Sequence, residues 1–144
     1  MSRNATIVER SVSQANRWLA ELGAEVEGDR GDAYRVLRAV LHALRDHLTV
    51  DEAAQLGAQL PELIRGIYYA EWDPSAAPST ANAKAFLARV ASRAMLAGDT
   101  EAAVMTGAVW RLLGRHVSAG ELNHVLGQMP RDLREVLTAP APQP

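Results

Sequence analysis

The sequence contains no cysteine among its 144 residues. Disulfide bonds, thiolate nucleophiles and cysteine-based zinc or iron–sulfur sites are therefore excluded. No apolar run approaches the roughly 20 residues that span a bilayer. The start, MSRNATIVERSVSQ, also lacks the continuous apolar stretch of a secretory signal. These absences favour a reducing compartment, so we expect a cytoplasmic protein without membrane contact.

Aromatic residues are also scarce, at 5% of the chain, whereas 48% of the residues are hydrophobic. The core must then consist mainly of Ala, Leu and Val, which suits closely packed helices, and Ala, Leu, Glu and Arg are good helix formers. Basic and acidic residues nearly balance, at 15 against 17, for a net charge of -2. Such a balance gives no field that would capture nucleic acid or an anionic membrane, so both partners are disfavoured.

Apolar residues recur at intervals of three and four along most of the chain, which is the spacing of amphipathic helices. No stretch shows the sustained alternation of polar and apolar residues that is typical of a strand. We therefore predict an all-α fold of about eight helices, with Asp29 or Asp32 capping the second and Asp99 the sixth. The apolar residues of these helices fall within 6–26, 36–48, 50–58, 61–72, 86–95, 104–113, 119–127 and 130–138.

Two segments of the chain resemble each other: HLTVDEAAQLGAQLP at 47–61 and HVSAGELNHVLGQMP at 116–130. At an offset of 69 residues, the 28 positions from Arg38 to Arg65 contain eight identities. Chance would give roughly two to four in a sequence rich in Ala and Leu, so we infer an internal repeat. We predict two pseudo-symmetric four-helix halves that share a core within one domain, because about 60 residues alone form only a marginal core. The expected divisions of residues 1–144 are half one at 7–72, a linker at 73–82, half two at 83–138 and a disordered tail at 139–144.

The residues that recur are mostly helix caps. A hydroxyl residue followed three positions later by Glu is a capping box, in which each side chain accepts a hydrogen bond from the other residue's backbone N–H. Proline suits the first position of the next helix, where a missing N–H costs nothing. We predict these structural roles for Thr49, Glu52, Ser118, Glu121, Pro61 and Pro130. His47 and His116 are expected at the ends of the preceding helices, where the helix dipole favours positive charge.

Three stretches carry a family resemblance: RVLRAVLHALRDHLTVDEAAQLGAQLPELIRGIYYAEWDP at 35–74, FLARVA at 86–91 and TGAVWRLLGRHVSAGELNHVLGQMPRDLREVL at 106–137. They resemble the bacterial domain-of-unknown-function family 2267, and the resemblance covers roughly Arg17 to Leu137. It implies a helical, duplicated bacterial domain. It implies no activity, cofactor or catalytic residue.

Motifs that would indicate catalysis or metal binding are weak. The sequence has no G-x-S-x-G, P-loop, H-E-x-x-H or Gly-rich dinucleotide motif. Glu121 and His124 have the Glu-x-x-His spacing of di-iron bundles, but the equivalent of His124 in the first half is Gln55. Glu52 and Glu121 would form a carboxylate pair if the halves brought them together, although the capping box also explains the neighbouring Thr and Ser. We therefore predict no catalytic, cofactor-binding or metal-binding residue and no cofactor.

Two groups of charged residues are predicted to lie on solvated faces. His42 and Asp46 are one helical turn apart and are expected to form an exposed pair. Five arginines on the two equivalent long helices would form a basic stripe in a nucleic-acid binder, but the short helix after them lacks basic side chains. These arginines are Arg35, Arg38, Arg45, Arg111 and Arg115.

The segment YYAEWDP at 68–74 holds the one cluster of aromatic residues. Tyr68, Tyr69 and Trp72 are our candidate interaction surface, because Tyr and Trp are frequent anchors of protein interfaces. The favoured alternative is that they pack the linker or seal the seam between the halves. The leading hypothesis for function is a non-enzymatic helical module that binds another protein or itself. The alternative is a small-ligand or metal-binding protein with a pocket between the halves, followed by a nucleic-acid binder.

Overall fold

The amphipathic segments form eight helices in the computed structural model, which describes residues 3–76 and 78–143, and no strand occurs within these residues. The prediction of an all-α fold with about eight helices is confirmed. The helices are α1 Arg3–Val26, α2 Arg30–Asp46, α3 Val50–Ala58, α4 Glu62–Tyr69, α5 Ala83–Ala94, α6 Asp99–His116, α7 Ala119–Gly127 and α8 Arg131–Leu137. Residues 1, 2, 77 and 144, which belong to the predicted domain, linker and tail, lie outside the described residues.

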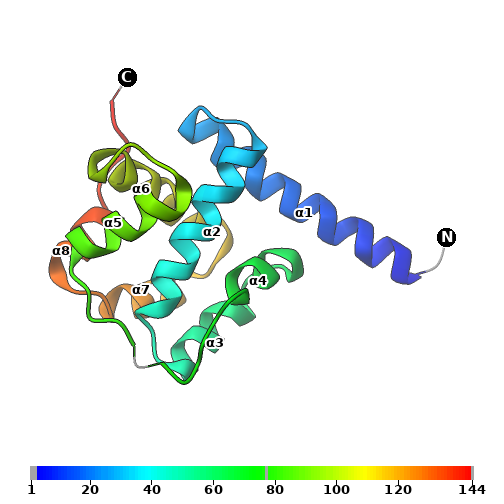
Figure 1. Ribbon diagram of the computed structural model, residues 1–144. Helices are drawn as coiled ribbons and strands as arrows, with labels where there is room; N and C mark the ends of the chain where they lie inside the picture. Colours follow the sequence, from blue (N-terminus) through cyan, green and yellow to red (C-terminus); the bar gives the residue numbers. More distant parts are fainter. Residues whose placement is uncertain (1–2, 77, 144) are drawn as a thin grey trace.

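The core forms around α2, which crosses the middle of the molecule and contacts α1, α4, α5 and α6 (Figure 1). Its apolar residues face several neighbours at once, so Leu37, Val40, Leu41 and Leu44 are fully buried. Each such side chain contributes about 1.5–3 kcal/mol to the free energy of unfolding. The second long core helix, α6, contacts α1, α2, α5, α7 and α8.

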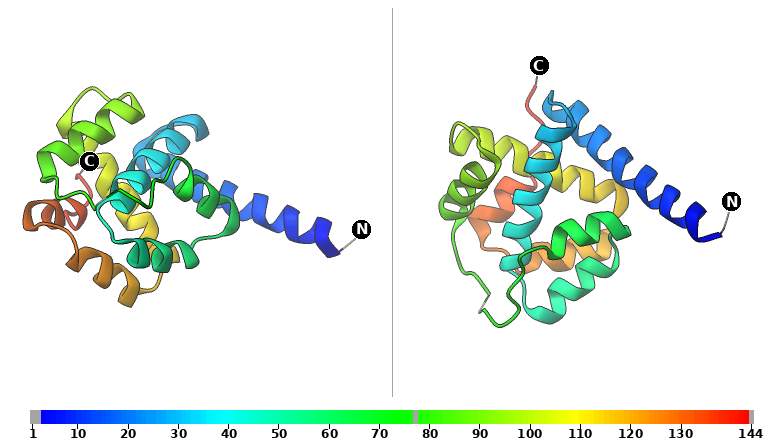
Figure 2. Two further views of the ribbon diagram at one scale, coloured as in Figure 1. Left: turned by 60° about the horizontal axis from the view of Figure 1, so that its bottom comes forward. Right: turned by 45° about the vertical axis from the view of Figure 1, so that its right-hand side comes forward.

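Helix α1 extends beyond the body on which it packs. Its 24 residues span about 36 Å at 1.5 Å per residue. The end that contains Trp18 and Leu22 is buried, whereas the N-terminal end extends past the other helices into solvent (Figures 1 and 2). None of the helices within the described residues combines the length and the hydropathy needed to cross a bilayer.

The predicted caps form in one half of the chain more completely than in the other. Thr49 accepts a hydrogen bond from the Glu52 backbone N–H, and Glu52 accepts one from the Thr49 N–H at 2.9 Å, so this capping box is complete. Ser118 accepts from the Glu121 N–H, but its own N–H donates to Gln59 Oε1 at 2.9 Å. The capping box predicted at Ser118 and Glu121 is therefore only half formed, because a side chain of the first half takes the place of Glu121.

The caps of four other helices can be compared with the sequence. Asp29 caps α2 and forms a capping box with Asp32, so both candidate residues take part. Helix α6 is capped by Gly98, with Asp99 as its first helical residue, so the predicted Asp99 cap is wrong. Pro61 and Pro130 occupy the N-cap positions of α4 and α8, one residue before the predicted first position. A shift of one residue is common at helix ends.

Two polar side chains of α2 hold the end of α4. Arg45 is buried, and its Nη1 donates to the Tyr68 carbonyl at 2.7 Å and to the Ala70 carbonyl at 2.9 Å. His42 Nε2 lies 2.7 Å from the Ile67 carbonyl oxygen. These carbonyls lie in the last turn of α4, where no intrahelical donor is available. The side chains of α2 therefore cap α4 from outside.

The exposed pair predicted for His42 and Asp46 is wrong. Only 1% of His42 is accessible to solvent, because α4 covers it. Asp46 accepts hydrogen bonds from Arg45 Nε at 2.9 Å and from Arg89 Nη2 at 2.5 Å. The spacing within α2 could not indicate that α4 and α5 would supply the partners.

Replacement of Arg45 should destabilise the fold strongly. Arg45→Met keeps the apolar stem but leaves two buried carbonyls without their donor, so the free energy of unfolding should fall by about 3 kcal/mol. Urea denaturation followed by circular dichroism measures this loss. The control Arg131→Met, on the exposed surface of α8, should leave the midpoint unchanged. A loss below about 1 kcal/mol for Arg45→Met would contradict the role of Arg45.

The unequal capping boxes also give a measurable difference. Glu52→Ala removes a hydrogen bond to the N-cap residue of α3 and should lower the free energy of unfolding by about 1 kcal/mol. Glu121→Ala removes no such bond, and Glu121 Oε1 is buried without a hydrogen-bond partner among the described residues. Its replacement should therefore leave stability unchanged or raise it slightly in the same denaturation experiment. Equal losses for the two variants would show that both boxes form in solution.

Candidate functional site

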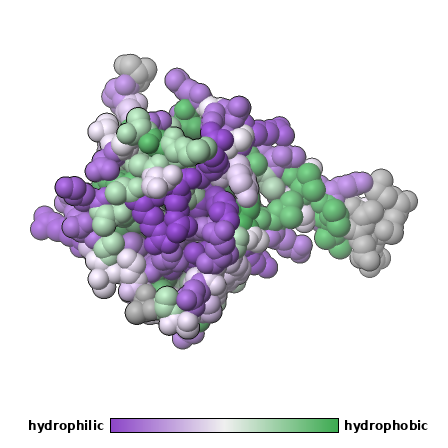
Figure 3. Space-filling model, viewed as in Figure 1, coloured by the Kyte–Doolittle hydropathy of each residue, from purple (hydrophilic) through white to green (hydrophobic). Residues whose placement is uncertain are grey.

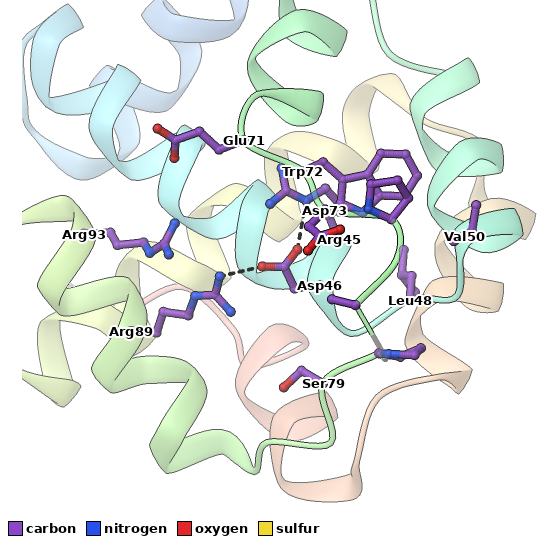
Figure 4. A pocket seen from close by; sticks show the side chains of 13 residues that line it. Arg45, Asp46, Leu48, Val50, Glu71, Trp72, Asp73, Ser79, Arg89 and Arg93 are labelled. Atoms are coloured by element: carbon purple, nitrogen blue, oxygen red, sulfur yellow. Dashed lines mark hydrogen bonds and ion pairs between the residues drawn. The ribbon is translucent and has the colours of Figure 1, made fainter.

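The surface between α2, α5 and the segment that follows α4 is hollowed into two adjoining cavities. The first cavity has a volume of about 330 Å³. Its wall includes Arg45, Asp46, Trp72, Arg89 and Arg93 (Figure 4). The second cavity has a volume of about 610 Å³ and shares Glu71 and Arg93 with the first. Hydrophilic residues gather on this face of the molecule (Figure 3).

The charges of the first cavity largely neutralise one another. Asp46 lies between Arg45 and Arg89 and accepts a hydrogen bond from each, as the dashed lines in Figure 4 show. Arg45 also donates through Nη1 to two backbone carbonyls, so its Nε and Nη1 groups are occupied within the protein. The first cavity is therefore mainly a structural junction of α2, α5 and the segment after α4.

The second cavity has more cationic groups without a full set of partners. Its wall consists of Tyr34, Arg35, Arg38, Ala39, His42, Glu71 and Arg93. Arg38 Nη2 lies 3.5 Å from Glu71 Oε1, and Arg35 pairs with Asp32. Arg93 makes no ion pair or hydrogen bond through its side chain with any residue that the structure describes. An uncommitted guanidinium at a cavity wall can bind an anion.

Of the five arginines of the predicted basic stripe, Arg45 is buried and the other four are divided between two surfaces. Arg35 and Arg38 line the second cavity. Arg111 and Arg115, by contrast, face α1 and pair with Glu25 at 3.1 Å and Glu21 at 3.2 Å. The structure therefore does not form one continuous stripe from these residues.

The aromatic cluster packs mainly against the protein itself. Tyr68 is fully buried, and its hydroxyl donates to the Ala53 carbonyl at 2.8 Å. Burial raises the pKa of the Tyr68 phenol, so it stays protonated. The proposed contact surface is corrected here, since a fully buried Tyr68 cannot reach a partner. Tyr69 and Trp72 are partly buried, with ring centres 5.3 Å apart, and an interface role for these two stays a prediction.

The acids and the histidine of the two short helices come only partly together. Helix α3 packs against α7, and His124 Nε2 lies 3.6 Å from Glu52 Oε2. No group of three or more His, Asp or Glu side chains in the described part of the chain is arranged to hold a metal ion. The Glu52–His124 contact is therefore an ion pair between helices when His124 is protonated.

The equivalent histidines at the helix ends have different partners. His47 follows α2, and its Nδ1 and Nε2 lie 2.9 Å and 3.0 Å from the Ala43 and Ala81 carbonyl oxygens. His116 ends α6, stacks on Trp18 and hydrogen-bonds to Glu21 Oε2 at 2.8 Å.

The contact with His116 also affects the ionisation of Glu21. Burial acts to raise the pKa of Glu21, but the hydrogen bonds and charges of His116 and Arg115 lower it by more. Ionised Glu21 thus ties α1 to α6.

The sequence does not predict the second cavity. The spacing of His42 within its helix indicates an exposed position, and Arg93 belongs to no recognisable motif. One signal was available: Arg89 and Arg93 are one turn apart on the face of α5 that also carries Phe86. That spacing predicts a basic edge beside the buried face, but it does not predict which helix the edge will meet.

Comparison with known proteins supplies a family. A family model described as an uncharacterized conserved protein, DUF2267, matches residues 15–136, which extend from α1 to α8. No curated protein matches the chain. The match confirms the family resemblance of the sequence. The chain therefore belongs to the DUF2267 family of uncharacterized conserved proteins.

Proposed function

We propose that the protein is a non-enzymatic helical module that associates through the projecting end of α1, and that its partner is a second copy of the chain. The observation that carries this proposal is the exposure of three apolar side chains on one helix end. Val8 is 62% exposed and Val12 is 44% exposed, and Ile7 lies beside them. A hydrophobic surface covers part of this end in Figure 3.

The apolar stripe of α1 continues from the core into solvent. Leu19 and Leu22 pack within the body, and Val12 and Val8 continue the same face at intervals of three and four. Leu63, on α4, which contacts α1, is also exposed. An unbroken stripe that leaves the body is typical of a helix whose outer part packs against another chain.

A second copy fits this surface better than a strongly charged partner. Between Thr6 and Gln14 the only charged residues are Glu9 and Arg10, and their charges cancel. Two copies can therefore approach without net repulsion. A twofold contact also needs only one patch, which both copies supply. Since the projecting part is short, we expect a weak dimer that buries less area than a standard interface.

The dimer should disappear when the exposed stripe becomes polar. We expect the wild-type protein to dimerise between about 5 and 500 µM, and the double variant Val8→Gln, Val12→Gln to raise the dissociation constant at least about tenfold, because four buried valines are lost per dimer. Analytical ultracentrifugation over this concentration range measures both.

A matched control is available on another helix. Val104→Gln changes a valine on α6 that is 37% exposed and should leave the dissociation constant unchanged. A wild-type protein that stays monomeric at about 500 µM would overturn the proposed self-association, and so would an equal effect of the control.

We also infer that α1–α4 and α5–α8 descend from one duplicated unit. The starts of α2, α3 and α4 precede those of α6, α7 and α8 by 69 residues each, which supports this origin. The contacts between helices also correspond in the two halves. The contact of α1 with α6 is equivalent to that of α5 with α2, and the contact of α2 with α4 is equivalent to that of α6 with α8. A crystal structure in which α1–α4 cannot be superposed on α5–α8 would contradict the duplication.

The bacterial source and the cytoplasmic location stay predictions.

A further inference from the structure

One buried acceptor in the second cavity has no partner. His42 Nε2 faces the Ile67 carbonyl oxygen, which can only accept, so Nε2 carries the proton. Burial lowers the pKa of His42 and keeps the ring neutral, so Nδ1 retains its lone pair. Nδ1 is inaccessible to solvent and has no hydrogen-bond partner among the described residues. A buried polar atom without a partner costs about 1–3 kcal/mol unless a bound group satisfies it.

Arg35, which lines the same cavity, has a buried donor without a partner. Arg35 Nε is inaccessible to solvent and lacks a hydrogen-bond partner in the described part of the chain. Arg38 and Arg93 line this cavity as well, and the Arg93 side chain makes no hydrogen bond or ion pair with the described residues. The wall therefore combines one neutral acceptor with several cationic donors. A ligand with negatively charged oxygens and a hydroxyl group would satisfy both, because its oxygens accept hydrogen bonds and its O–H donates one.

We propose that the cavity between α2, α5 and Glu71 binds a small oxyanion that carries a hydroxyl group. Its charged oxygens would lie against Arg35, Arg38 and Arg93, and its O–H would donate to His42 Nδ1. A protonated phosphate group and a hydroxy acid share this chemistry. The volume of about 610 Å³ lies within the range of small-molecule sites.

Glu71 is the one acidic side chain among the described residues of this wall, and it competes with the ligand. It pairs with Arg38 at 3.5 Å, but its side chain is 68% exposed and is free to swing into solvent. Exposed ion pairs of this kind contribute little free energy, so an anion can replace Glu71 at Arg38. Removal of its charge should strengthen binding, an effect that general destabilisation of the protein cannot produce. The site does not involve the apolar stripe of α1, so it stands or falls independently of the proposed self-association.

The test uses two pairs of anions. In each pair, one anion has a hydroxyl donor and the other has none. Phosphate and sulfate are compared at pH 7 and constant ionic strength, since phosphate carries an O–H at this pH and sulfate does not. Glycolate and acetate are compared in the same way. We expect phosphate or glycolate to bind saturably and about fivefold or more tightly than its counterpart, which is the effect of one hydrogen bond. Whichever pair shows the preference identifies the phosphate or the hydroxy acid as the source.

Titrations followed by nuclear magnetic resonance also report the atom involved. The Nδ1 resonance of His42 in long-range proton–nitrogen spectra should move on addition of the bound probe, while that of exposed His124 should not. Arg93→Gln should weaken binding about tenfold, as expected for one charged hydrogen bond, and Glu71→Gln should strengthen it. The control Arg134→Gln changes an exposed arginine on α8 and should have no effect.

Three results would overturn the proposal. The first is the absence of saturable binding for all four probes. The second is equal affinity within both pairs, because the hydroxyl group would then have no partner. The third is equal weakening by Arg93→Gln and Arg134→Gln, which would show a general effect of net charge.

Discussion

The burial of α2 between α1, α4, α5 and α6 is the constraint on which the rest of the structure depends. A helix covered on several sides buries some of its polar side chains together with its apolar ones. Arg45 and His42 therefore need partners inside the protein, and the last carbonyls of α4 need donors. The two requirements meet at one junction, which also fixes the segment after α4 and forms the walls of both cavities.

The contacts across the molecule form two comparable seams, one between α2 and α5 and one between α6 and α1. At the contact of α6 and α1, Trp18 stacks on His116, and two glutamates of α1 pair with Arg111 and Arg115. The cavity beside Trp18 and His116 has a volume of about 210 Å³, which is smaller than that of the second cavity. Helix α5 has 12 residues against 24 in α1, and it contributes arginines instead of glutamates. The second cavity and its uncommitted Arg93 lie at the contact of α2 and α5. The proposed anion site therefore belongs to this contact.

The two proposed binding surfaces lie in different parts of the molecule, because α1 projects beyond the core. Its buried end completes the core, and its projecting end offers an apolar surface to a second copy. The cavity of α2 and α5 is lined by residues of other helices. Binding of an anion and self-association therefore use different residues, so each can be removed without the other.

The sequence by itself determined the eight helices and most of their ends. Helical periodicity and caps such as Thr49 with Glu52 depend on hydrogen bonds and contacts within about four residues, which the local sequence contains. Only the tertiary structure decided that Tyr68 and His42 are buried, that Gln59 replaces Glu121 at Ser118, and that the stripe of α1 continues beyond the core. The candidate site belongs to this second group, because α2 and α5 are distant in the sequence. The partner of a long side chain such as Arg93 depends on which helix packs opposite it, and packing of the whole core makes that choice.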